Sequence, residues 1–148
     1  MADPGPADHP AAEACWLTFL SDYGYDDVQV GVCHGVVARL APQVRVIDVC
    51  HAVAAGDVEH GAMMLAAAVP YLPVGVHLAA VDPIRAEGSA RPVAVRCSDG
   101  STFVAPDNGL TSRPLLRPAP RRIFDVGRVT ARLSGSFRSP AGTPDGYG

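Results

Sequence analysis

Polar residues follow three apolar stretches of the chain, each where a strand is expected to end. Asp22 follows CWLTFL, the pair Asp48 and His51 closes VRVIDV, and Asp82 follows GVHLAAV. In an α/β sheet, ligands gather in the crevice beyond the carboxyl ends of the strands, so these side chains are candidate site residues. Each Asp taken alone is better explained as a helix cap or a turn former than as a functional residue.

The segment Ser21-Asp22-Tyr23-Gly24 suits the binding of a vicinal diol such as ribose. A carboxylate accepts two hydroxyl hydrogen bonds at once, which makes Asp22 the candidate group. Gly24 lets the backbone approach a ligand closely, or serves a tight turn. The later segment Pro106-Asp107-Asn108-Gly109 is a turn signature, and becomes a polar recognition loop only in the right context.

Alternating strand and helix patterns are expected to position these residues. We predict strands over residues 15–20, 44–49 and 75–81, helices over 28–40 and 59–69, and a hairpin of 92–97 with 101–105. The first helix is expected to pack on the sheet through Val28, Val32, Val36 and Leu40, and Asp57 is expected to cap the second. The order predicts an α/β fold with a mixed, mostly parallel sheet and helices on both faces.

The length of 148 residues fits one folded unit. We assign residues 15–112 to an α/β domain and expect residues 1–14 to be a disordered tail. Residues 113–148 are rich in Arg, Pro and Gly, and we expect a weak strand near 123–129 followed by a loose tail.

Composition and motifs narrow the functional classes. A net charge of −3 argues against nucleic acid as a partner. We find no secretion signal and no apolar run long enough to cross a membrane, so a cytoplasmic protein is expected, with its four cysteines reduced. The scattered histidines predict no metal site, and the chain lacks P-loop, dinucleotide-binding and GxSxG motifs.

Three segments in order resemble the S-adenosylmethionine hydroxide adenosyltransferase family, whose relatives include the fluorinase and the chlorinase. These segments are LTFLSDYGYDDVQVGVCHGVVARLAPQVRVIDVCHAV, GDVEHGAMMLAAAVPYLPVGVHLAAVDP and FVAPDNGL. The resemblance implies a mixed sheet between helices, followed by a smaller carboxyl-terminal β-barrel, in a trimeric assembly. It places the substrate between the amino-terminal domain of one subunit and the barrel of its neighbour.

The resemblance also assigns roles to individual residues. It implies that Asp22 holds the ribose hydroxyls, that Asp27 lies near the methionine end, and that Asn108 in FVAPDNGL contacts the substrate. Hydrolytic members use an Asp, an Arg and a His to direct water at the ribose C5′ of S-adenosylmethionine, and Asp82 matches that Asp. Asp82 also argues against halogenation, because the halogenases have another residue type there. No metal or cofactor is implied.

The chain departs from the family pattern after Asp82. Where the family has a DPGVG turn and two adjacent Arg, this chain reads DPIRAEGSARPVAV. Arg91 meets the second Arg while Ala90 occupies the place of the catalytic one, so we predict Arg91 as the catalytic Arg, with Arg85 as the alternative. Arg138 occupies the place of the catalytic His of the family's FHGRD stretch.

The chain ends at Gly148, so the family's β-barrel is expected to be absent and the chain truncated. Two functional hypotheses follow from the resemblance. One is hydrolysis of S-adenosylmethionine to adenosine and methionine. The other is a non-catalytic remnant that binds an adenosine-like ligand or a full-length homologue.

Overall fold

The computed structural model describes residues 15–82, 84–85, 88–116 and 118–126. The tail expected at residues 1–14, the tail after residue 126 and the predicted position of Arg138 lie outside this range. The backbone of Arg85 is described, but its side chain is not.

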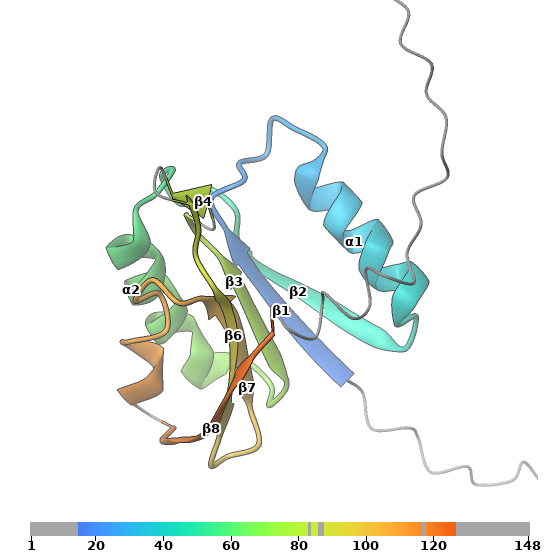
Figure 1. The fold of residues 1–148 in the computed structure, drawn as a ribbon. Helices are drawn as coiled ribbons and strands as arrows, with labels where there is room; N and C mark the ends of the chain where they lie inside the picture. Colours follow the sequence, from blue (N-terminus) through green and yellow to red (C-terminus); the bar gives the residue numbers. More distant parts are fainter. Residues whose placement is uncertain (1–14, 83, 86–87, 117, 127–148) are drawn as a thin grey trace, which may run out of the picture.

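A six-stranded sheet with the strand order β2-β1-β3-β7-β6-β8 forms the centre of the molecule (Figure 1). Its strands are β1 (Cys15–Ser21), β2 (Val44–Cys50), β3 (Val76–Ala80), β6 (Pro92–Cys97), β7 (Thr102–Pro106) and β8 (Pro120–Asp125). The pairs β1 with β2, β1 with β3, and β3 with β7 are parallel, whereas β6 pairs antiparallel with β7 and β8. The predicted mixed, mostly parallel sheet is confirmed.

The helices connect the parallel strands. Helix α1 (Gln29–Leu40) joins β1 to β2, and α2 (Val58–Ala68) with the short helix η1 (Val69–Tyr71) joins β2 to β3. Because β2 and β3 lie on opposite sides of β1, right-handed crossovers place α1 and α2 on opposite faces of the sheet (Figure 1). Asp57 caps α2 as predicted, its carboxylate accepting a hydrogen bond from His60 N.

Two smaller features complete the fold. Strands β4 (Ile84–Arg85) and β5 (Gly88–Ser89) form a separate antiparallel pair just beyond Asp82. Helix η2 (Pro114–Leu116) precedes β8. The weak strand expected near residues 123–129 is found as β8 at Pro120–Asp125, because β6 supplies its partners from Val93 to Cys97.

The hydrophobic core lies between the sheet and α2. Alternate residues of the strands point to this face and are almost completely buried, including Leu20, Ala79, Val95 and Phe103. Ala62 and Leu65 of α2 and Leu110 close this core from the other side. Burial of these side chains is the main stabilising contribution, at about 1.5–3 kcal/mol for each large one.

The predicted packing face of α1 is wrong. Val28, Val32, Val36 and Leu40 are 71%, 57%, 47% and 71% exposed, and none of the residues of α1 is fully buried. The partly covered residues are instead Val30, Cys33, His34 and Val37, which also recur at helical spacing. A hydrogen bond of 2.9 Å between His34 Nε2 and Asp48 Oδ1 on β2 accompanies this rotation of the helix. Apolar residues follow both stripes of α1, so periodicity alone could not identify the packed one.

Candidate functional site

The polar strand ends meet at one edge of the sheet, as the parallel arrangement requires. Asp22, at the end of β1, accepts two backbone hydrogen bonds on Oδ2, from Gly56 N at 3.1 Å and from Asp82 N at 3.0 Å. Its Oδ1 makes no hydrogen bond to the described part of the chain, and the side chain is half-buried. Asp22 therefore fixes two loops with one oxygen and leaves the other without a hydrogen bond to the described residues.

Asp82 has an unusual backbone conformation. It is the only non-glycine residue in the described ranges with a positive φ, at 48°. Such conformations cluster at functional sites, where neighbouring contacts stabilise them. Two such contacts are present here: Asp22 accepts from Asp82 N, and Asn108 Nδ2 donates to Val81 O at 2.9 Å and to Asp82 O at 3.4 Å.

Gly56 belongs to the same cluster. Its φ is 74°, which only glycine adopts at low cost, and a Cβ built on it would lie 4.0 Å from Asp82 Cγ. Gly56 N therefore faces Asp22 while its Cα lies next to the Asp82 carboxyl group. The structure thus brings Asp22, Asp82 and Asn108 together, three of the candidate site residues from the sequence.

Arg91 lies at the same edge, just before β6. Its guanidinium donates to Asp107 Oδ2 at 2.8 Å, and both side chains are more than half exposed. The hydrogen bond that Arg91 donates to Asp107 raises the pKa of Arg91, which favours the charged guanidinium. Since Asp107 directly precedes Asn108, the cation is held one residue away from the group that fixes Asp82.

Asp27 lies at the far end of the β1–α1 loop. It is exposed, and its Oδ1 accepts a hydrogen bond from Val28 N at 2.6 Å, just ahead of α1. Among the predicted site residues, Asp27 is therefore the one whose described contact is with the start of a helix rather than with the strand-end cluster.

A second polar cluster connects β1, β2 and α1. His51 Nδ1 lies 2.7 Å from Ser21 Oγ, and His51 Nε2 lies 3.0 Å from Asp48 Oδ1. His34 Nε2 meets the same carboxylate oxygen at 2.9 Å. The sequence indicated Asp48 and His51 as a strand-end pair, but it gave no signal that Ser21 and His34 join them.

Geometry and charge in this cluster favour an ionised Asp48. The His51 ring does not direct Nε2–H along the line to Oδ1 that a hydrogen bond needs, and no other partner meets that nitrogen in the described residues. The contact is therefore a close approach of His51 Nε2 to the Asp48 carboxylate, at 3.0 Å. Partial burial acts to raise the pKa of Asp48, but the interactions with His51 and His34 outweigh it and lower the pKa.

Tyr23 is the neighbouring phenol. Burial, then the nearby Cys33 thiol and then the Asp22 carboxylate raise its pKa. The phenol therefore remains protonated at neutral pH, and it keeps a hydroxyl beside the Asp22 loop that can donate and accept.

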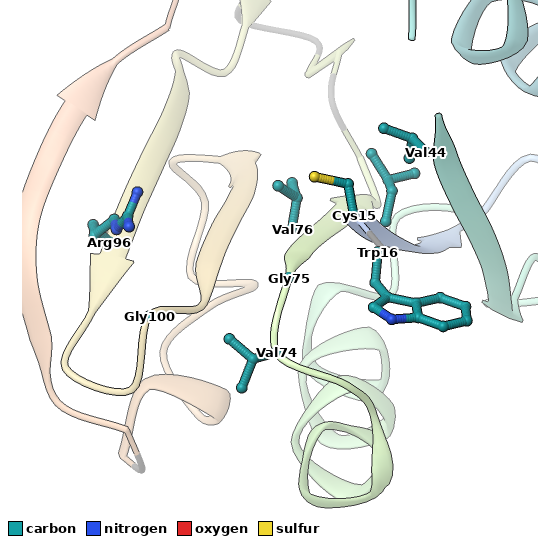
Figure 2. Close-up of a pocket in the computed structure, with 9 residues that line it drawn as sticks. Cys15, Trp16, Val44, Val74, Gly75, Val76, Arg96 and Gly100 are labelled. Atoms are coloured by element: carbon teal, nitrogen blue, oxygen red, sulfur yellow. The ribbon is translucent and has the colours of Figure 1, made fainter. Parts of the chain in front are cut away.

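A hollow lies at the opposite edge of the sheet (Figure 2). Its volume is about 440 Å³, and it is lined by Cys15, Trp16, Val44, Val76 and neighbouring residues near the amino ends of the parallel strands. Its lining contains no carboxylate. The carboxylates and the strained backbone lie at the other edge, so we place the candidate site there.

Two features are absent from the described residues. They contain no group of three or more His, Cys, Asp or Glu side chains arranged to hold a metal ion. They also contain no helix with the length and apolar character needed to cross a membrane.

Comparison with known proteins places this chain in a family. The model of the SAM hydroxide adenosyltransferase N-terminal domain matches residues 17–139. An (R)-S-adenosyl-L-methionine hydrolase of Salinispora tropica is 56% identical over 96 residues, which cover 64% of this chain and 36% of that protein. A fluorinase of Nocardia brasiliensis is 32% identical over 85 residues, covering 57% of this chain and 28% of that protein.

The fold agrees with this comparison. A crystal structure of a conserved hypothetical protein from Thermus thermophilus matches with a TM-score of 0.67 and 39% identity, covering 78% of this chain and 49% of that one. The chain spans about a third of the length of the two named relatives, so their activities belong to larger proteins.

Proposed function

The chain belongs to the SAM hydroxide adenosyltransferase family, and on that premise we propose that its site serves the hydrolysis of S-adenosylmethionine to adenosine and methionine. The hydrogen bond between Asp22 Oδ2 and Asp82 N carries this proposal. It brings the proposed diol-binding carboxylate and the proposed water-directing residue to one edge of the sheet.

The substrate contacts follow from the geometry of Asp22. Two backbone amides hold Oδ2, so the carboxylate is fixed before any ligand arrives. Oδ1 has two acceptor positions for the 2′- and 3′-hydroxyls of a ribose. A preorganised acceptor avoids part of the entropy cost of ordering a side chain on binding.

The reaction needs orientation more than activation. Water attacks C5′ as the bond from C5′ to the sulfonium sulfur breaks, which yields adenosine, neutral methionine and one proton. A sulfonium is a good leaving group, so the protein's task is to hold a water in line with that bond. In our proposal Asp82 accepts a hydrogen bond from this water and takes up its proton, and Arg91 supplies positive charge nearby. We propose no cofactor for this step.

Hydrolysis is preferred to halogenation on the strength of sequence similarity. Identity to the hydrolase of Salinispora tropica is 56%, against 32% to the fluorinase of Nocardia brasiliensis. We also propose that the substrate pocket is completed by a carboxyl-terminal domain of a neighbouring subunit in a trimer. A cytoplasmic location fits four free cysteines, because thiols stay reduced there.

Binding without turnover is a second candidate function. The observation in its favour is the hydrogen bond between Arg91 and Asp107, which directs the guanidinium at a carboxylate of its own chain. In that case Asp22 still binds an adenosine-like ligand, and no group polarises the water beside Asp82.

Isotope labelling tests the proposal. The protein is incubated with S-adenosylmethionine in ¹⁸O-labelled water, and the products are separated by chromatography and weighed by mass spectrometry. We expect adenosine that carries ¹⁸O at the 5′ position, with production abolished in Asp82→Asn and a raised KM in Asp22→Ala. Unchanged turnover in both variants overturns the site assignment. Adenosine binding in calorimetry without turnover supports the second candidate.

A further inference from the structure

His51 is completely buried although it borders the half-exposed site. Its Nδ1 lies 2.7 Å from Ser21 Oγ, and its ring packs edge-on against Phe19 and Tyr25, with centroid separations of 4.6 and 5.7 Å. The ring is therefore in contact with β1 and with the loop that follows it, while Nε2 lies next to Asp48.

The backbone of His51 holds the same loop. Its carbonyl oxygen accepts a hydrogen bond from Gly24 N at 2.7 Å, and its amide donates to Tyr25 Oη at 3.2 Å. Together with Ser21, these contacts attach the loop on both sides of Asp22. Asp22 itself then reaches Gly56, which lies farther along the loop that begins with His51.

We infer that His51 is a positioning residue of the site, which fixes the Asp22 carboxylate by holding Ser21 and the loop through Tyr25 against the β2–α2 loop. This inference rests on the proposed function, because it gives Asp22 the ribose-binding role. His51 itself touches no substrate.

The tautomer of His51 depends on the direction of its hydrogen bond with Ser21. If the Ser21 hydroxyl donates to Nδ1, the proton of the neutral ring lies on Nε2, which faces Asp48 Oδ1. The same Asp48 oxygen lies 2.9 Å from Nε2 of His34, which belongs to α1. The carboxylate therefore favours one ring orientation, and through Ser21 that orientation sets the position of Asp22.

The Ser21, His51 and Asp48 side chains are not a nucleophilic triad. Ser21 is completely buried, so a substrate carbonyl cannot reach its Oγ. The contact also runs through Nδ1 to the hydroxyl and Nε2 to the carboxylate, and Ser21 Oγ accepts a further hydrogen bond from Tyr23 N at 3.3 Å. These contacts instead hold the loop that follows β1 in place.

The chain offers a matched control on the other face of the sheet. His77 Nδ1 lies 2.9 Å from Thr18 Oγ1, and both residues are as deeply buried as His51 and Ser21. Thr18 belongs to the same strand as Ser21 but lies away from the strand end. Ser21→Ala and Thr18→Val each remove one buried hydroxyl from a histidine, and only the first removes it next to Asp22.

Two measurements on the folded variants test the inference. Hydrogen exchange at the Gly56 and Asp82 amides reports whether Asp22 Oδ2 still accepts from them. Calorimetry with adenosine and with 2′-deoxyadenosine reports whether Asp22 grips the diol. In Ser21→Ala we expect both amides to exchange on the order of tenfold faster and adenosine affinity to fall about tenfold. The affinity for 2′-deoxyadenosine should fall less, because that nucleoside keeps only the 3′-hydroxyl for Asp22 to bind. Thr18→Val leaves all of these at the wild-type level.

A second pair of variants covers the case in which Ser21→Ala fails to fold. His51→Asn places an amide where Nδ1 stands, so it retains the Ser21 contact and near-normal amide protection. His51→Leu lacks that group and loses the protection.

The inference is overturned if hydrogen exchange at the Gly56 and Asp82 amides is unchanged in both Ser21→Ala and His51→Leu. This holds regardless of the nucleoside affinities. An equal loss of affinity for both nucleosides also overturns it, since that indicates a general structural role. If the wild-type protein binds neither nucleoside while Ser21→Ala still accelerates exchange at the two amides, the proposed function falls and the positioning of Asp22 by His51 stands.

Discussion

The carboxylate of Asp22 and the backbone amide of Asp82, 60 positions apart in the sequence, are joined by a hydrogen bond of 3.0 Å. The contact links the end of β1 to the turn after β3, two strands that pair in parallel. One side chain thus holds the backbone of the residue that we propose to direct water. The same bond contributes to stability and to the geometry of the site.

Removal of the Asp22 carboxylate is expected to destabilise the fold as well as to weaken ligand binding. In Asp22→Ala the amides of Gly56 and Asp82 lose their acceptor, which costs about 1–3 kcal/mol of unfolding free energy. Urea denaturation measures this loss. Asp27→Ala is the control, because Asp27 is exposed and its described hydrogen bond goes to Val28 N alone. An equal loss in the two variants contradicts the bridging role of Asp22.

Arg91 is expected to matter for chemistry and not for stability. Its hydrogen bond to Asp107 is exposed to solvent, and exposed ion pairs contribute little to folding. Arg91→Ala should therefore unfold at the wild-type temperature while it loses adenosine production. Arg113→Ala breaks a similarly exposed bond of 2.8 Å to Glu59, and it should keep both properties. Wild-type turnover in Arg91→Ala would remove Arg91 from the proposed mechanism.

His77 makes the stability of the protein sensitive to mild acid. Burial lowers its pKa below the ordinary value of 6.5, so the unfolded chain binds a proton more tightly than the folded one. The stabilisation is complete above pH 6.5 and declines as the pH falls from there toward the lowered pKa, with a slope of at most about 1.4 kcal/mol per pH unit for one proton. Unfolding free energies measured between pH 8 and 5 test this dependence.

His77→Asn isolates this contribution from the other histidines. Asn retains a polar group beside Thr18 Oγ1 and does not titrate, so its stability curve should be flatter than that of the wild type. Parallel curves for the two proteins show that the proton is taken up elsewhere.

Two glycines give opposite predictions for the same substitution. A Cβ on Gly75 would lie 2.4 Å from the backbone oxygen of Trp16, a distance that requires the first strand to move. Gly75→Ala should therefore destabilise the protein by about 1–3 kcal/mol. Gly35 lies inside α1 with nothing within 4 Å of its Cβ position, so Gly35→Ala should stabilise by up to about 1 kcal/mol. The unfolding temperatures of the two variants test both predictions. A change of the same sign in both temperatures is incompatible with this packing.

Local patterns predicted the sheet and much of the site. The apolar runs ending at Ser21 and Ala80 are long and β-prone, and the alternation of strands with helices leaves few topologies for a parallel sheet. Once strand ends are known, parallel pairing alone brings Asp22 and Asp82 to one edge. The proximity of Asn108 follows from the parallel pairing of β7 with β3.

The contacts that depend on side-chain direction were not predictable in this way. Whether Arg91 turns toward Asp107 depends on the antiparallel register of β6 with β7, which is a three-dimensional property. The joining of His34 to Asp48 depends on the rotation of α1, and both stripes of that helix are apolar. In each case two local solutions satisfy the sequence pattern, and tertiary packing selects one.

The rotation of α1 can be tested by one substitution made on each stripe. Val32 is 57% exposed, whereas Val37 lies among the partly covered residues on the His34 side of the helix. Val32→Ser and Val37→Ser change helix propensity equally, so the difference between them reports buried apolar area. We expect Val37→Ser to cost about 1 kcal/mol more, because it removes a half-buried side chain from the sheet interface. Denaturant unfolding of the two variants measures this difference, and a larger loss in Val32→Ser would place the Val32 stripe on the sheet instead.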